Sequence, residues 1–231
     1  MMWKRILKRA DAIVAVAGSV EAFCRTAWKL LPEKIHKIYN AVPVNRFLDI
    51  PPPSLPEAGV WRIVTLGRLE RQKGHDILLR ALAMCADLPW RLSVFGVGSL
   101  ESDILKNARL HAIEDRVALC GIGNTAEALR HADMVVQPSR FEGRSLVVME
   151  AMAAGRCVVA SDAAGLELIE HEKTGVIVPH DNTSLLAQAI RRVLTEHGFA
   201  KRLGESARDY ARRHFGFDTW MKEVESLYES L

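Results

Sequence analysis

The stretch RIVTLGRLERQKG at residues 62–74 contains the unit that decides the fold. Its first five residues are rich in β-branched and apolar side chains, which predicts a buried strand over 62–66. A turn bounded by two glycines follows, and apolar residues at helical spacing then predict a helix over 76–85. A strand, a tight turn and a helix in this order are typical of a parallel α/β sheet.

The same unit recurs along the chain. The pattern predicts further strands over 91–95, 117–120, 134–137, 157–160 and 176–178, separated by helices over 102–110, 125–130, 145–154 and 182–196 and by a short helical turn at 166–170. Short apolar strands that alternate with helices favour a parallel sheet covered on both faces. The predicted fold class is therefore α/β, a Rossmann-like parallel sheet with helices on both faces. Ligands of such sheets bind beyond the carboxyl ends of the strands.

The two ends of the chain depart from this pattern. Residues 1–47 hold two helical patterns and two short strands, which is too little to form a core alone. A proline-rich segment within residues 48–56 predicts a linker. Residues 216–231 form an amphipathic helical pattern. We expect both ends to pack against something else.

Composition limits the classes of function. The 231 residues carry a net charge of +3 spread along the chain, which gives little support to a nucleic-acid partner. No apolar run approaches the ~20 residues that span a bilayer. A weak leader-like pattern near the N-terminus is interrupted by Asp11. The four cysteines form no CxxC pair, so we expect no metal site, and three buried free thiols in a reducing, cytoplasmic compartment.

The turn at 67–74 is a candidate phosphate site. Gly67 lets a ligand approach the backbone, and the N-terminus of the following helix offers free N–H groups to an anion. Arg68 can bind phosphate oxygens bidentately, and Lys73 adds a point charge. Taken alone, the segment is equally compatible with a solvated basic turn that caps a helix.

A second candidate segment, SRFEGRSLVVME at 139–150, follows the fourth predicted strand. The chain turns at Gly143 and enters a helix, so Glu142 is predicted at the carboxyl edge of the sheet. Glu150 lies about two turns further along. A carboxylate can accept hydrogen bonds from ribose or hexose hydroxyls, and the N–H groups near Ser145 can face an anion. Two carboxylates alone are more often surface charge, but Glu150 lies in an apolar stretch where an unpaired charge is costly.

Together these motifs resemble the family four glycosyltransferases, a large group of retaining enzymes with the GT-B architecture. The resemblance is carried by G-R-L-x-x-x-K-G at 67–74 and by E-x7-E at 142–150, which continues into EAMAAG. Shorter matches follow in family order over nearly the whole chain: ADAIVAV at 10–16, KIYNAVP at 37–43, GVG at 96–98, HAD at 131–133, QPS at 137–139 and TGVIVP at 174–179.

The resemblance implies a role for each matching residue. It makes Arg68, Lys73 and Glu142 the catalytic set, with the two cations on the diphosphate of a nucleoside-diphosphate sugar and the carboxylate beside the transferred sugar. Glu150 is implied to hold the ribose. The other implied donor-binding residues are Gly67, Gly143, Arg144, Ser145, Leu146 and, near the base, Gly121 and Ile122. The implied enzyme transfers a sugar with retention, uses no metal and needs no cofactor besides its donor.

The resemblance also implies a domain organisation. Residues 1–47 match the last elements of an N-terminal acceptor domain, 57–215 match the donor domain, and 216–231 match the helix that crosses back onto the acceptor domain. We therefore expect a partner chain that supplies the rest of the acceptor domain, or self-association. An apolar stripe within residues 3–10 leaves peripheral contact with the inner face of a membrane open, although packing on a sheet explains it better.

The chain departs from the family pattern at three places. Ala41 replaces a usual glycine, the loop at 163–167 is one residue short, and Arg144 replaces a smaller or aromatic residue. These changes bear on sugar preference more than on donor binding. Two rival functions stand beside transfer: a donor-binding subunit or inactive remnant, and a nucleotide-sugar epimerase, for which no acid–base pair is evident.

Overall fold

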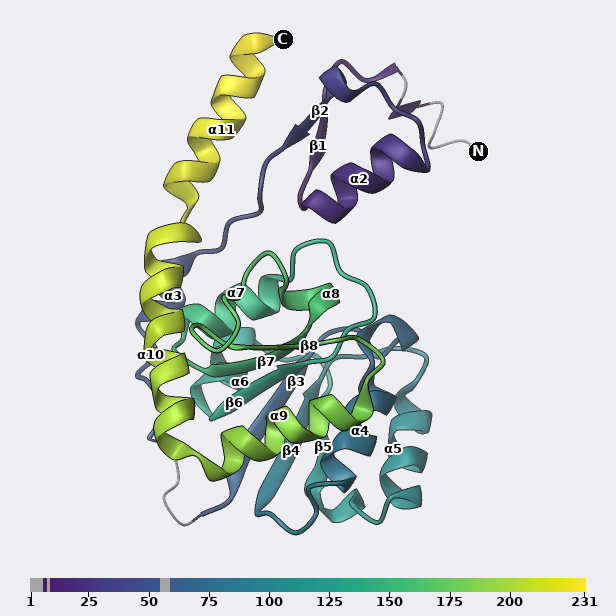
Figure 1. Ribbon diagram of the computed structural model, residues 1–231, viewed down its shortest axis with the longest axis vertical. Coiled ribbons are helices and arrows are strands. Elements are labelled where there is room, and N and C mark those ends of the chain that lie inside the picture. The colour runs from purple at the N-terminus through teal and green to yellow at the C-terminus, as the bar shows by residue number, and fades with distance from the viewer. Residues whose placement is uncertain (1–5, 8, 55–58) are drawn as a thin grey trace.

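The computed structural model describes residues 6–7, 9–54 and 59–231, and one sheet of six parallel strands forms its centre (Figure 1). The strands are β3 (Trp61–Leu66), β4 (Trp90–Phe95), β5 (Val117–Leu119), β6 (Met134–Gln137), β7 (Cys157–Ser161) and β8 (Val176–Val178). Their spatial order is β5-β4-β3-β6-β7-β8, which confirms the Rossmann-like fold class. The order reverses between β3 and β6. Ligands of doubly wound sheets bind in the crevice at such a switch point.

Helices cover both faces of this sheet, because successive residues of a strand point to opposite sides. On one face lie α4 (His75–Ala83), α5 (Glu101–Leu110) and α9 (Thr183–Thr195). On the other lie α6 (Thr125–Arg130), α7 (Leu146–Ala153) and α8 (Asp162–Gly165). α10 (His197–His214) packs on both cores, with Phe199 and Leu203 in the first and Ala207 in the second. Ile63 and Met134 enter the first core, and their neighbours Val64 and Val135 enter the second.

A small unit precedes the sheet. It consists of β1 (Ile13–Ala15), α2 (Gly18–Thr26), the 3-10 turn η1 (Pro32–Lys34) and β2 (Ile35–Lys37), and its two strands pair in parallel. Figure 1 shows α2 next to the loops around α7 and α8. The Glu167 carboxylate holds it there, since its two oxygens accept hydrogen bonds from the Gly18 N–H at 2.9 and 3.1 Å.

The segment between the two units packs into the main core. α3 (Val44–Leu48) places Phe47 in the apolar cluster that α7 and α10 share, and Ile50 follows it there. At the other end of the chain, α11 (Phe217–Ser230) continues from α10 toward β2 (Figure 1). Among the described residues, no helix is long and apolar enough to cross a membrane.

The six sheet strands and most of the helices lie within two residues of their predicted bounds. The exceptions are informative. No prediction covers α10, whose exposed residues are mostly charged and whose buried positions include small alanines such as Ala207 and Ala211. The helical turn predicted at 166–170 was misplaced, because the helix lies at Asp162–Gly165 and residues 166–170 form a turn and irregular backbone.

Two smaller expectations concern cysteines and the N-terminal stripe. Cys24, Cys85 and Cys157 are buried free thiols, which confirms the expected three, and Cys120 is exposed. In the apolar stripe of residues 3–10, Trp3 lies outside the described residues. Leu7 and Ala10 pack against the small core of the N-terminal unit, whereas Ile6 is exposed.

Candidate functional site

Two loops meet at the switch point of the sheet. The loop after β3 carries residues 67–74 and includes the 3-10 turn η2 (Arg71–Lys73), and the loop after β6 carries residues 138–145. Gln72 joins them, because its carbonyl accepts the Arg140 N–H at 2.8 Å and its side-chain amide donates to the Phe141 carbonyl at 2.7 Å. The two candidate segments of the sequence are therefore neighbours in space.

The centre of this junction is an ion pair between Lys73 Nζ and Glu142 Oε1. Both side chains are largely shielded from water, at 14% and 11% exposed, so the attraction is less screened than at an open surface. Gly67 makes room for the pair. A Cβ at this position would lie 2.9 Å from Lys73 Cε, so the lysine side chain packs across the glycine.

Arg68 lies on the solvent side of the same junction. Its side chain is exposed, and Nη2 donates to Gln72 Oε1 at 3.3 Å. In the part of the chain that the structure describes, its remaining N–H groups have no partner and are available to an anionic ligand. Arg68 and Lys73 thus place two cationic side chains on the loop after β3, one exposed and one paired with Glu142.

Two helix N-termini add to this positive field. α4 begins after Gly74, whose φ of 70° is in the left-handed region, and α7 begins after Ser145. Neither N-cap residue caps its helix with a side chain, so the first N–H groups of α7 and that of His75 remain for an anion, whereas the Asp76 carboxylate accepts from its own N–H. Burial, together with the neighbouring Lys73 charge, lowers the pKa of His75 to about 4, so this ring stays neutral near pH 7.

Glu150 lies further along α7 and is partly buried. Burial raises the pKa of its carboxyl to about 7, and the Arg46 charge opposes this shift. Within the described residues the carboxyl has no hydrogen-bond or ion-pair partner. Arg46 extends from α3 and donates to Asn124 Oδ1 at 3.0 Å, in the loop after β5. The sequence reasoning did not identify Arg46, and no motif signals it.

The same loop contains the residues predicted to border a base. Gly121 has a φ of 64°, and a Cβ there would meet nothing within 4 Å, so open space surrounds it. Ile122 is 84% exposed, an unusual position for an apolar side chain. Ile122 therefore presents a free apolar side chain in the loop after β5, the edge strand of the sheet. Their role in binding a base stays a prediction.

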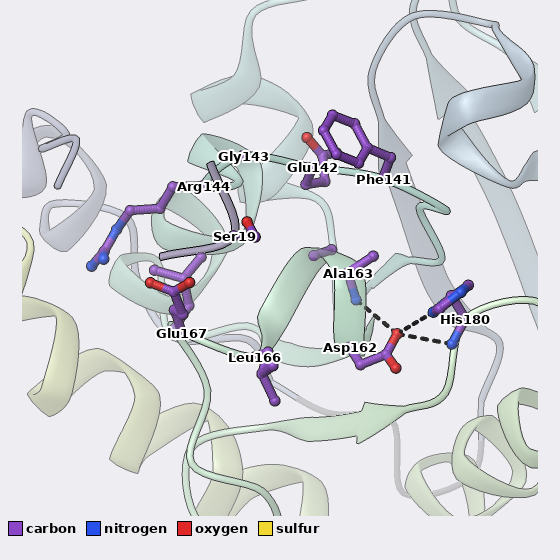
Figure 2. Close-up of a pocket in the computed structure, with 12 residues that line it drawn as sticks. Ser19, Phe141, Glu142, Gly143, Arg144, Asp162, Ala163, Leu166, Glu167 and His180 are labelled. Atoms are coloured by element: carbon purple, nitrogen blue, oxygen red, sulfur yellow. Dashed lines mark hydrogen bonds and ion pairs between the residues drawn. The ribbon is translucent and has the colours of Figure 1, made fainter. Parts of the chain in front are cut away.

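A cavity of about 270 Å³ lies beside Glu142 (Figure 2). Its wall combines Phe141 and Gly143 with residues from distant segments: Ser19, Asp162, Leu166 and His180. Asp162 Oδ1 accepts hydrogen bonds from His180 Nδ1 at 2.8 Å and from the His180 N–H at 3.0 Å. The sequence reasoning missed Ser19, Asp162 and His180 as a group, because they come from three segments with no shared motif.

Arg144 is placed differently from Glu142. Figure 2 shows its side chain directed away from Glu142, and its Cζ lies 4.0 Å from the centroid of the Tyr39 ring. Burial lowers the pKa of its guanidinium, and Nε is buried without a partner among the described residues. The neighbours Ser145 and Leu146 are 3% and 45% exposed, so only Leu146 presents a side chain to solvent. Donor-binding roles for these three residues stay predictions.

The comparisons with known proteins agree with this geometry. Residues 61–196 match the family described as glycosyl transferases group 1. The chain belongs to this family. Its matched region begins with β3 and ends after α9, so it includes all six sheet strands and both loops of the switch point.

Curated relatives of this group 1 domain carry transferase names. The chain is 30% identical over 224 residues to a D-inositol 3-phosphate glycosyltransferase of Streptomyces bingchenggensis, and the alignment covers 85% of this chain and 48% of that protein. It is 28% identical over 237 residues to a lipopolysaccharide core biosynthesis mannosyltransferase of Rhizobium leguminosarum bv. viciae, covering 99% of this chain and 67% of that protein. A third relative, the glycosyltransferase MJ1607 of Methanocaldococcus jannaschii, is 32% identical over 172 residues. The chain covers 44% of that protein and 48% of the Streptomyces bingchenggensis protein, so it spans about half the length of these two relatives.

Solved structures extend the similarity to the small N-terminal unit and α11. A sucrose-phosphate synthase from Thermosynechococcus elongatus superposes on 100% of this chain with a TM-score of 0.84 at 27% identity, over 60% of its own chain. HepE of Anabaena, in complex with UDP and glucose, superposes with a TM-score of 0.87 at 22% identity, covering 100% of this chain and 66% of HepE.

Proposed function

We propose that this chain binds a nucleoside-diphosphate sugar at the β3–β6 switch point and is the donor-binding part of a retaining glycosyltransferase. The observation that carries the proposal is the convergence of Arg68, Lys73 and two uncapped helix N-termini beside Glu142. This set matches a diphosphate, which carries several negative charges, joined to a sugar with many hydroxyl groups. The cavity beside Glu142 supplies space for the sugar.

The arrangement suits departure of a diphosphate. When the bond between the sugar and the phosphate breaks, negative charge grows on the diphosphate oxygens. Arg68 and Lys73 stabilise that charge, and Lys73 is in place before the donor arrives, because Glu142 already fixes it. The raised pKa of Glu150 leaves its carboxyl partly ionised near pH 7, where it can accept hydrogen bonds from the ribose.

The relatives support the class of donor. HepE of Anabaena was solved with UDP-glucose, and we propose the same class of ligand for this chain. Retention is the stereochemistry of the family that the motifs resemble, and we propose it here on that basis. Measurement of the anomeric configuration of a product by NMR tests this part of the proposal.

Transfer also requires a site for the acceptor. Because the chain spans about half the length of the first curated relatives, we propose that acceptor recognition depends on a further domain or partner chain. Epimerisation is the rival reaction, and incubation with the donor alone separates the two. Conversion of the donor to its epimer without acceptor would favour the epimerase.

Calorimetry with UDP, GDP, ADP and dTDP tests the donor site. We expect one nucleotide to bind selectively, and Lys73→Ala or Arg68→Ala to weaken it by about 1–3 kcal/mol, the range for hydrogen bonds to charged groups. Lys106→Ala is the matched control, because Lys106 is exposed on α5 and contacts only Asp103, at 3.7 Å, among the described residues. Absence of binding by the wild type, or equal affinities for Lys73→Ala and Lys106→Ala, contradicts the proposal.

A further inference from the structure

Glu142 is held by a short chain of buried hydrogen bonds that starts at the end of β6. Gln137 Nε2 donates to Ser139 Oγ at 3.2 Å, and Ser139 Oγ donates to Glu142 Oε1 at 2.9 Å. Gln137 and Ser139 are both 0% exposed. A hydroxyl has one proton, so Ser139 accepts from Gln137 and gives its own hydrogen to Glu142.

The backbone of Ser139 is fixed as well. Ser161, at the end of β7, donates its hydroxyl to the Ser139 carbonyl at 2.6 Å. Ser139 is thus attached to two neighbouring strands of the sheet, through its own chain and through Ser161. A side chain on such rigid elements defines a position more accurately than one on a free loop.

Both partners of Glu142 use the same carboxylate oxygen. Lys73 Nζ and Ser139 Oγ each bind Oε1, whereas Oε2 has no donor in the described part of the chain. An ionised carboxylate has about four lone-pair sites on its two oxygens. Glu142 also lines the cavity, so its unused acceptor capacity lies where a ligand enters.

We propose that Ser139, oriented by Gln137, is a positioning residue that holds Glu142 Oε1 so that Oε2 can accept a hydrogen bond from a hydroxyl of the donor sugar. This inference rests on the proposed donor site and adds the element that orients its sugar end. Lys73 alone does not set the orientation, because an ammonium group is a point charge on a flexible stem. The directional hydrogen bond from Ser139 does.

The test compares a nucleotide with and without its sugar. Calorimetry of the full chain with UDP-glucose and with UDP measures the contribution of the sugar. For Ser139→Ala we expect UDP-glucose affinity to fall about 3- to 10-fold and UDP affinity to change less than about twofold, since one hydrogen bond is lost at the sugar end. Thr174→Val is the matched control, because it removes a buried hydroxyl that accepts a hydrogen bond from the Glu170 N–H at 2.9 Å and contacts neither Ser139 nor Glu142 among the described residues.

Two further measurements keep the inference distinct from the function it rests on. In a Glu142→Ala background, which removes the acceptor of the Ser139 hydroxyl, we expect Ser139→Ala to cause no additional loss of UDP-glucose affinity. Equal losses for UDP and UDP-glucose, or an undiminished loss in that background, overturn the positioning role. If the wild type binds neither ligand, the UDP-sugar form of the proposed function fails. In that case a crystal structure of the ligand-free Ser139→Ala variant tests the positioning role. An unchanged Glu142 rotamer overturns the inference, and a changed Glu142 rotamer supports it.

Discussion

At the scale of single residues, Glu150 has a carboxyl group whose charge depends on the fold. Burial raises its pKa from 4.5 to about 7, so the folded chain binds this proton more tightly than the unfolded chain does. The resulting stabilisation is fully present below pH 4.5 and is lost as pH rises through 7. A carboxylate without a partner thus costs stability at alkaline pH.

Replacement of this carboxyl by an amide tests the sign. We expect Glu150→Gln to raise the free energy of unfolding at pH 8 by about 1–2 kcal/mol over wild type, and by much less at pH 5. The expected gain is smaller than the free energy that corresponds to the full pKa shift, because solvent screens a partly exposed group. Urea denaturation at both pH values measures the difference. Glu225→Gln, at an exposed position on α11, is the control. A gain that is equal at both pH values contradicts the explanation.

At the scale of elements, the glycines of the Gly96-Val97-Gly98 turn hold β3 and β4 close together. The motif suggests dinucleotide binding when it is considered alone, but the structure shows a packing requirement. A Cβ at Gly96 would lie 1.9 Å from the Gly67 carbonyl oxygen, and one at Gly98 would lie 2.5 Å from the Leu69 carbonyl oxygen. The backbone of this turn therefore supports the turn at residues 67–74 that follows β3.

Alanine at this turn should separate the two loops. We expect Gly96→Ala to lower the free energy of unfolding by about 2–4 kcal/mol, because the methyl group clashes with backbone and the φ of 145° is strained for other residues. Gly198→Ala is the control, since nothing lies within 4 Å of a Cβ there. That helical site should gain about 0.5–1 kcal/mol. Urea denaturation compares them, and a Gly96→Ala chain as stable as wild type rules out the clash.

At the scale of the whole molecule, α11 has no buried residue among those described. Three of its large apolar side chains are exposed: Phe217, Met221 and Tyr228. Leu231, which follows the last residue of the helix, is exposed as well. A helix with an apolar face and no partner on it favours association with another surface. The expected crossover onto an acceptor domain is one such partner, and a second copy of the chain is another.

Light scattering over a range of concentrations tests this expectation. We expect the isolated chain to self-associate, and Met221→Glu with Tyr228→Glu to shift it toward monomer, because the two changes replace exposed apolar area with charge. Ser230→Glu adds a charge to the same helix without removing apolar area and should have a smaller effect. A wild-type chain that stays monomeric at all concentrations contradicts the prediction.

The fold and the pairing of the two site segments were predictable to different degrees. Runs such as Met134–Gln137 are buried on both faces. Their apolar residues alone predict a strand, since hydrophobic patterning is a local property. The order of the motifs then indicated the family and placed Arg68, Lys73 and Glu142 in one site. Helix α10 was missed because its core contacts are made by few large side chains.

What local pattern could not supply was the direction of side chains across the switch point. Lys73 and Glu142 are 69 residues apart, and their ion pair exists because the loops after β3 and β6 meet. The same packing turns Arg144 onto Tyr39, away from Glu142. Periodicity along one segment determined which strands and helices form. The contacts between distant segments, which depend on strand order and rotamers, determined which of their side chains share the site.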